Sequence, residues 1–302
     1  HNVFGDEWEY LDAFFAEVYE EENTLIYIKD KEIVGALYMI PYDMVIEGRV
    51  DKIVYLYALA TKPEYRRQGI MSDLINESIR ISTERGYYLS VLIPDSRDLF
   101  GFYEKFGYEE LFSRTIIKRT REEIEINIGN IIPNQLIENN HEKAEIEIDK
   151  QKDYKEVNRE LSKDMFLKKG SIQELWEIYS NSNLVNQEGI ILSKDQFDFY
   201  LRELEHEGGE GIVFYSGRDI LGYALIRCEE DELIIIENTI SEDNWDSFSC
   251  ELINKYDIQK ITLYQPTCFS KEEIQAGRSA FAMGKKLKDV DIIDPYINCV
   301  LM

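Results

Sequence analysis

The spacing of apolar residues predicts a β-hairpin near the start of the chain. Residues 24–28 and 33–39 are rich in β-branched and aromatic residues, and the four polar residues between them have the length of a tight turn. The next run, residues 52–60, is apolar on both faces, which is typical of a central strand covered on both sides. It ends in the polar, proline-containing segment 61–64. The pattern therefore predicts a sheet with a buried central strand.

A helix is predicted directly after this strand. Between Gly69 and Gly86 the apolar residues have helical spacing, and Gly86 is a natural helix C-cap. Residues 87–93 form another predicted strand, and residues 98–105 form a short helix that Gly107 closes. This order indicates two parallel strands joined by a crossover helix.

The second half of the chain repeats the first in outline. Residues 211–226 predict a second hairpin, in which Gly222 takes the place of Gly35. A central strand over 233–237, a helix over 243–256 and a strand over 258–264 then follow in the same order as before. Two tandem domains of the same kind are the simplest interpretation.

The region between the repeats has a different character. Residues 121–164 are rich in Glu, Lys and Asn and have no sustained period before about residue 155, so they predict a connector that carries at most a short helix. We therefore expect domains at 1–120 and 165–302, joined by the connector 121–164. A length of 302 residues is enough for two domains that each bury a core.

Composition narrows the class of protein. Hydrophobic residues make up 44% and charged residues 31%, the balance of a soluble globular chain, and no apolar run approaches the length of a membrane span. We expect a cytosolic protein that does not bind membranes. The four cysteines have no metal-ligand spacing, so no metal site is predicted.

The net charge of −25, from 34 basic and 59 acidic residues, argues against nucleic-acid binding and favours cationic partners. The loop between the central strand and the first long helix is basic, opposite in sign to the net charge of the chain. Arg66 and Arg67 precede Gly69, where the backbone can turn closely, and the first N–H groups of the helix point out of its end. These features predict a site for a phosphate-bearing ligand, with a solvated turn as the alternative.

The segment Arg66-Arg67-Gln68-Gly69-Ile70-Met71 resembles the signature of the GNAT superfamily of N-acetyltransferases, Arg/Gln-x-x-Gly-x-Gly/Ala. Met71 departs from that pattern, which prefers a small residue there. Residues 61–65 before the loop and 102–108 after it also match, so the resemblance covers about residues 24–119. It implies an α/β (α+β) fold of two tandem GNAT-like domains, each a mixed, centrally splayed sheet flanked by helices.

The resemblance also implies roles for particular residues. Backbone groups of Leu59, Ala60 and Thr61 would hold the acetyl and pantetheine part of acetyl-CoA. The loop, with backbone amides of residues 67–71 and the Ser72 hydroxyl, would hold the pyrophosphate; its residues are Arg66, Arg67, Gln68, Gly69, Ile70, Met71 and Ser72. Tyr103 matches the tyrosine that often protonates the leaving thiolate, although a tyrosine that only packs is the alternative.

The proton acceptor is left open by the sequence. A water relay to Glu22, to Asp51 or to backbone carbonyl groups is one option. The enhanced intracellular survival proteins, which also carry a degenerate second GNAT-like domain, suggest another, the terminal carboxylate of Met302. Tyr55 and Tyr57 lie on one face of the central strand, where they line an acceptor groove or pack the core.

The leading hypothesis is an N-acetyltransferase that moves the acetyl group of acetyl-CoA to a primary amine on a cationic small molecule or a peptide. The second is a non-catalytic acyl-CoA sensor, and a third is transfer of a longer acyl chain. The second domain has the acidic segment 240–244 in place of the basic loop, so we expect one acyl-CoA per chain. The sequence does not indicate the oligomeric state.

Overall fold

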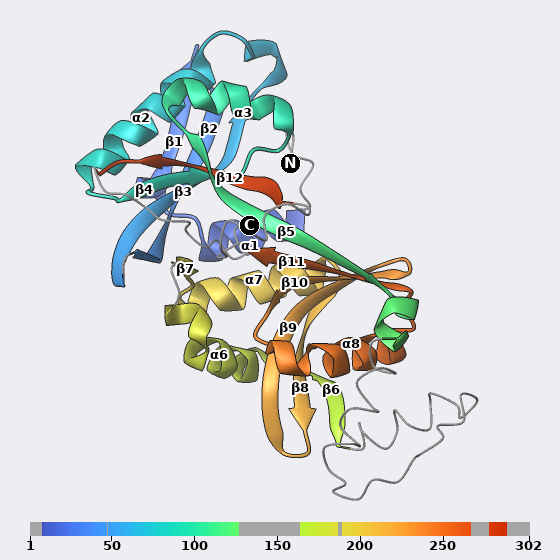
Figure 1. The fold of residues 1–302 in the computed structure, drawn as a ribbon. Coiled ribbons are helices and arrows are strands. Elements are labelled where there is room, and N and C mark those ends of the chain that lie inside the picture. The colour runs from blue at the N-terminus through green and yellow to red at the C-terminus, as the bar shows by residue number, and fades with distance from the viewer. Residues whose placement is uncertain (1–7, 47, 127–163, 187–188, 267–277, 289–302) are drawn as a thin grey trace, which may run out of the picture. The chain divides into compact units, whose positions relative to one another are not determined.

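The computed structural model describes residues 8–46, 48–126, 164–186, 189–266 and 278–288. They belong to two compact units, which Figure 1 colours along the chain. The first unit comprises 1–115, 182–203 and 266–302, and the second comprises 116–181 and 204–265. Each unit is therefore assembled from segments that are far apart in the sequence.

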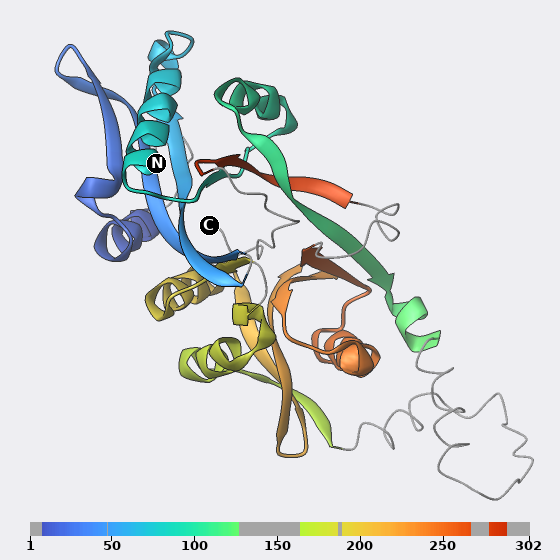
Figure 2. The same ribbon diagram turned by 60° about the vertical axis from the view of Figure 1, so that its left-hand side comes forward.

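The first unit is built on a mixed sheet with the strand order β1-β2-β3-β4-β12-β5 (Figure 2). Its strands are β1 (Thr24–Lys29), β2 (Glu32–Ile46), β3 (Arg49–Thr61), β4 (Leu89–Leu92), β12 (Arg278–Lys286) and β5 (Glu109–Thr120). The β3–β4 pair is parallel, and β12 pairs antiparallel with both β4 and β5. A short strand, β7 (Gly189–Ile191), pairs with β2.

Helices flank both faces of this sheet. The α-helices are α1 (Trp8–Glu17), α2 (Ile70–Glu84), α3 (Arg97–Tyr103) and α7 (Lys194–His206), with 3₁₀ turns at Glu21–Asn23, Pro63–Tyr65, Glu104–Phe106 and Asn183–Asn186. Leu37 lies in the core under α2 and α3, whereas the next residue, Tyr38, contacts Phe14 of α1 with ring centroids 5.1 Å apart. The alternation of a strand thus sends successive side chains of β2 to two helical layers.

The second unit repeats this plan, with the order β5-β11-β10-β9-β8-β6. Its further elements are β6 (Met165–Lys169), α6 (Ile172–Asn181), β8 (Gly209–Ser216), β9 (Asp219–Glu229), β10 (Glu232–Asn238), α8 (Glu242–Tyr256) and β11 (Lys260–Pro266). The β10–β11 pair is parallel, as β3–β4 is, and α8 packs on the sheet through Phe248, Leu252 and Ile253. The predicted fold of two mixed sheets flanked by helices is confirmed.

Gly35 and Gly222, at matching positions of the repeat, both lie where a side chain would clash. A Cβ atom on Gly35 would lie 2.7 Å from Cγ2 of Ile70, and one on Gly222 would lie 2.7 Å from Cδ1 of Ile240. In both units the second hairpin strand therefore approaches the segment after the central strand too closely for a side chain. This close approach supports the repeat that the sequence predicts.

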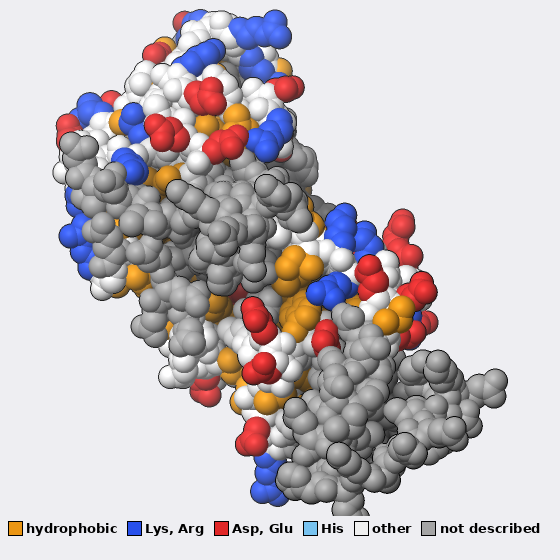
Figure 3. Space-filling model, in the orientation of Figure 1, with side chains coloured by type: hydrophobic (Ala, Val, Ile, Leu, Met, Phe, Trp, Pro, Cys, Tyr) orange, Lys and Arg blue, Asp and Glu red, His pale blue; other side chains and the backbone are white. Residues whose placement is uncertain are grey.

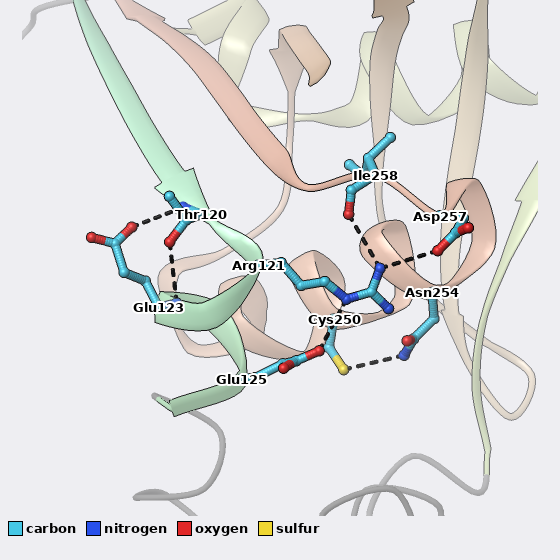
Figure 4. A network of polar contacts seen from close by, with 8 residues as sticks. All are labelled: Thr120, Arg121, Glu123, Glu125, Cys250, Asn254, Asp257 and Ile258. Atoms are coloured by element: carbon cyan, nitrogen blue, oxygen red, sulfur yellow. Dashed lines mark hydrogen bonds and ion pairs between the residues drawn. The ribbon is translucent and has the colours of Figure 1, made fainter. Parts of the chain in front are cut away.

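The start of the predicted connector is part of the second unit. Residues 121–126 are helical, and Thr120 and Glu123 form a reciprocal capping box with bonds of 2.8 and 3.3 Å (Figure 4). These bonds hold the pKa of Glu123 below its usual value. Arg121 contacts Glu125, Asp257 and the carbonyl of Ile258. Residues 127–163 lie outside the described residues, and the domain boundaries at 120 and 164 stay a prediction.

Candidate functional site

Strands β3 and β4 part before β3 ends. Their parallel register runs from Ile53 opposite Leu89 to Tyr55 opposite Val91, yet β3 continues to Thr61. Residues 53–56 of β3 are buried, and residues 57–61 are half-buried. The last part of β3 therefore lacks β4 as a hydrogen-bonding neighbour, which makes its backbone groups on that edge candidates for binding a ligand.

A β-bulge lies at this point of β3. Tyr38 of β2 is opposite Tyr57, but Ala36 is opposite Ala60, so β3 carries one extra residue. The bulge contains Ala58, whose backbone adopts a left-handed conformation with a φ of +50°. A left-handed alanine costs about 1–2 kcal/mol, and such strain is concentrated at functional sites. The bulge turns the backbone of Leu59 and Ala60 relative to the regular strand.

The end of β3 carries an unsatisfied polar group. Oγ1 of Thr61 is buried and has no hydrogen-bond partner among the described residues. The carbonyl of Thr61 accepts a 3.2 Å bond from Nε of Arg66, which ties the strand to the following loop. Leu59 packs against the core. The three predicted residues 59–61 thus lie together at the splayed edge.

The loop from Arg66 to Gly69 ends in an uncapped helix N-terminus. Arg67 has a φ of +62° and Gly69 a φ of +85°, and no side chain of a described residue caps α2. A Cβ atom on Gly69 would meet nothing within 4 Å, so its surroundings are open. The first N–H groups of α2 thus have no side-chain cap among the described residues, and the space beside Gly69 is open, which together suit a phosphate group at a helix N-terminus.

Cations surround this loop. Arg66 and Arg67 are exposed and form no ion pair with a described residue. Gln68 accepts a 2.9 Å bond from Nζ of Lys29 and donates a 3.2 Å bond to the carbonyl of Glu64. Figure 3 shows acidic and basic side chains interspersed on one face of the molecule, so a group of unpaired cations in a chain of charge −25 is a local exception. An anionic ligand fits it.

Tyr103 lies at the end of α3 and is 7% exposed. It shares a core with Val54 and Leu56 of β3, and its ring is 6.3 Å from that of Tyr108. Burial, with a smaller contribution from the carboxylate of Asp95, raises the pKa of Tyr103 to about 12. A phenol in this setting keeps its proton at neutral pH and can donate it.

The tyrosines of β3 separate into two environments. Tyr55 is buried, and burial is the main cause of its raised pKa, so it belongs to the core. Tyr57 is half-buried, and its hydroxyl lies 2.5 Å from that of Tyr10 on α1. Phe14 packs against Tyr57 with ring centroids 5.5 Å apart. Of the two, Tyr57 is the better candidate for an acceptor groove.

The carboxylates suggested for proton transfer differ in position. Asp51 pairs with Arg49 at 3.0 Å, and Leu59 follows it eight positions later in β3, about 26 Å along an extended strand. It is too far from the splayed edge for a single water relay. Glu22 lies in the turn before β1, and its carbonyl accepts a bond from Arg85. Met302 lies outside the described residues.

Residues 1–111 match the family model described as an acetyltransferase (GNAT) domain. The match to a GNAT acetyltransferase domain thus covers 111 of the 302 residues of the chain. The match covers the splayed strands, the loop and Tyr103, and acyl transfer is the chemistry of the family. No curated protein matches the chain in sequence.

Solved structures share the fold over both units. A probable N-acyltransferase from Enterococcus faecalis V583 is 15% identical with a TM-score of 0.68, over 94% of this chain and 67% of that one. A GCN5-related N-acetyltransferase from Anabaena variabilis is 17% identical with a TM-score of 0.63, over 94% and 66%. Eis1 from Mycobacterium abscessus is 12% identical with a TM-score of 0.61, over 93% and 70%. The chain thus spans about two thirds of their length and shares their fold.

Within the described residues, no group of three or more His, Cys, Asp or Glu side chains is placed to bind a metal, and no helix meets the length and hydropathy of a membrane span.

Two features of the site are not predicted by the sequence. The bulge at Ala58 has no signal, because alanine is not typical of left-handed positions. Lys29 approaches the loop only through the pairing of β1 with β2.

Proposed function

We propose that the chain is an acyl-CoA-dependent N-acyltransferase that transfers an acetyl group from acetyl-CoA to a primary amine. The observation that carries the proposal is the continuity of the splayed edge of β3, the bulge at Ala58 and the uncapped, cation-rich loop at the start of α2. An extended thioester with a pyrophosphate fits this order, since one end needs strand-edge backbone groups and the other needs anion-binding groups.

The predicted cofactor residues divide between the two ends of the ligand. Backbone groups of Leu59, Ala60 and Thr61 bind the acetyl and pantetheine part. The amides from Arg67 to Met71 bind the pyrophosphate with the hydroxyl of Ser72, which is half-buried in the first turn of α2. The buried hydroxyl of Thr61 gains a partner there, which supports a polar ligand at the end of β3.

Tyr103 is the proposed proton donor. The amine nitrogen forms a bond to the thioester carbonyl carbon, the carbon–sulfur bond breaks, and the departing sulfur takes the phenolic proton of Tyr103. The amine loses its own proton to a water relay or a carboxylate, and Glu22 and the carboxylate of Met302 stay candidates. Solvent then restores the proton of Tyr103. Tyr103 is protonated at neutral pH, as an ordinary phenol is, and its raised pKa extends the donor form to higher pH.

The acceptor proposed is a cationic amine, either a small polyamine or a lysine or terminal amine on a peptide. The net charge of −25 favours such a partner. The tyrosine pair Tyr10 and Tyr57 offers half-buried aromatic surface and hydroxyl groups on the face of β3 that α1 covers. A cytosolic location stays a prediction.

The test is the release of free CoA from acetyl-CoA in the presence of a panel of amines. Stimulation of release by at least one amine, with the acetylated amine as product, supports the enzyme. Tight acetyl-CoA binding with no stimulation by any amine would instead support the sensor. The same assay with longer acyl donors measures acyl-chain preference.

A further inference from the structure

Lys29 is placed at the phosphate-binding loop by two contacts. It is the last residue of β1, and Nζ donates a 2.9 Å bond to Oε1 of Gln68, thirty-nine residues away in the sequence. The same ammonium lies 5.6 Å from the centroid of the Tyr65 ring. The hairpin therefore brings a cation to the middle of the loop whose amides are proposed to bind pyrophosphate.

The charge of Lys29 is not neutralised by a described carboxylate. Nearby, Lys62 forms an ion pair with Glu32, and this contact raises the pKa of Lys62 and lowers that of Glu32. Carboxylates of Asp30, Glu32 and Glu64 act on Tyr65, but no ion pair joins any of them to Lys29. Its polar partner is the neutral amide of Gln68.

We propose that Lys29 is a phosphate-binding residue of the acyl-CoA site. When acyl-CoA binds, its ammonium exchanges the carbonyl oxygen of Gln68 for a phosphate oxygen of the cofactor. The exchange is favourable because a hydrogen bond between two charged groups is roughly twice as strong as one to a neutral acceptor. Gln68 keeps its bond to the carbonyl of Glu64, so the loop retains its shape. This inference rests on the proposed function.

The experiment measures binding of CoA and of 3′-dephospho-CoA to the full chain by titration calorimetry. The variant is Lys29→Gln, and the matched control is Lys31→Gln, because both lysines are exposed, lie two residues apart and lose the same charge. Lys29→Arg preserves the charge at the site. Melting temperatures of all variants check that the hairpin still folds.

We expect Lys29→Gln to weaken CoA binding about tenfold, as for loss of one charge-assisted hydrogen bond, while Lys31→Gln changes it less than about twofold. Lys29→Arg should restore most of the affinity. A loss for both ligands assigns Lys29 to the pyrophosphate, and a loss for CoA alone assigns it to the 3′-phosphate. Equal affinities of the Lys29→Gln and Lys31→Gln variants for both ligands would overturn the inference. Absence of CoA binding by the unmodified chain would instead overturn the proposed function.

Discussion

Gly69 combines a left-handed backbone with open surroundings. Its φ of +85° disfavours every other residue type, and the space beside it is empty of described atoms within 4 Å. We expect Gly69→Ala to destabilise the chain by about 1–2 kcal/mol through backbone strain and also to weaken acetyl-CoA binding, because the added methyl group enters the space proposed for the pyrophosphate. Thermal unfolding and calorimetry measure the two effects.

The chain offers a matched control for that experiment in Gly86. It has a φ of +74° after the end of α2 and equally open surroundings, but it lies at the opposite end of the helix. Gly86→Ala should cost similar stability and leave acetyl-CoA affinity unchanged. If both variants lost affinity equally, the effect of Gly69→Ala would be one of stability alone.

We predict that Tyr103 contributes to catalysis by donating its phenolic proton to the leaving thiolate. Tyr103→Phe keeps the packing of the ring and removes the donor, so we expect kcat to fall about 10²- to 10⁴-fold, the usual contribution of general acid catalysis, with little change in KM for acetyl-CoA. Initial rates over a range of acetyl-CoA concentrations measure both constants. An unchanged kcat would remove Tyr103 from the mechanism.

The pKa of Tyr103 adds a prediction about pH. Since burial raises it to about 12, the donor stays protonated across the range in which an exposed tyrosine would ionise. The rate profile should therefore show no loss of kcat from Tyr103 between about pH 9 and about pH 11. A decline centred near pH 10 that is absent from Tyr103→Phe would contradict the buried environment.

Residue-scale features differ in how far the sequence predicts them. The left-handed conformation of Gly69 can be predicted from the sequence, because a glycine directly before a helical pattern is typical of such a turn, and its role in binding phosphate stays a prediction. Ala58 does not, since its left-handed conformation is imposed by the pairing of β2 with β3. The position of Lys29 likewise depends on register across a hairpin. Conformations set by tertiary pairing leave no trace in local composition.

At the scale of elements, Gly35 and Gly222 occupy matching positions in the two units, so alanine variants of the two can be compared directly. Gly35→Ala would place Cβ 2.7 Å from Ile70 in the first turn of α2, and Gly222→Ala would place it 2.7 Å from Ile240 before α8. Both variants should lose about 1–3 kcal/mol of stability from overpacking, and Gly222→Ala should lose more than Gly35→Ala because its φ of +152° also favours glycine. We expect only Gly35→Ala to raise KM for acetyl-CoA, because only that helix carries the proposed phosphate loop.

Measurement of both variants under conditions where each stays folded separates the outcomes. An equal rise of KM in Gly35→Ala and Gly222→Ala would indicate a general loss of structure. An unchanged KM in Gly35→Ala would show that the start of α2 tolerates displacement, which would argue against a precise role for its amides.

Local elements are predicted well where the pattern is short-range. The first hairpin, the central strand and the helix after Gly69 correspond to β1, β2, β3 and α2, and their bounds agree within a few residues except at the end of β2, which continues seven residues beyond the predicted residue 39. The placement of β7 and β12 was not predicted, because it depends on strand partners in the other half of the sequence. Of the candidate site, the loop and Tyr103 follow from sequence, whereas the splay needs the register of β3 and β4.

At the scale of the whole molecule, the repeat is unequal in charge. In the second unit, α8 begins after Ser241 with Glu242 and Asp243 in its first turn, and Asn238 accepts a 3.0 Å bond from the N–H of Ile240. Carboxylates at that end repel phosphate groups. We therefore predict a calorimetric stoichiometry of one acetyl-CoA per chain. A second binding event that survives Gly69→Ala would contradict this assignment.

The overall charge leads to a prediction about the acceptor. A field from 59 acidic and 34 basic residues attracts a polyamine more strongly than a monoamine, and salt screens it. Raising ionic strength from about 0.1 M to about 1 M shortens the Debye length from about 10 Å to about 3 Å, so kcat/KM should fall more steeply for the polyamine. The monoamine, measured at the same acetyl-CoA saturation, controls for effects of salt on the cofactor loop. If both amines lost kcat/KM in the same proportion, the acidic surface would have no part in recognising the acceptor, and its selection would depend on short-range contacts such as those of Tyr57.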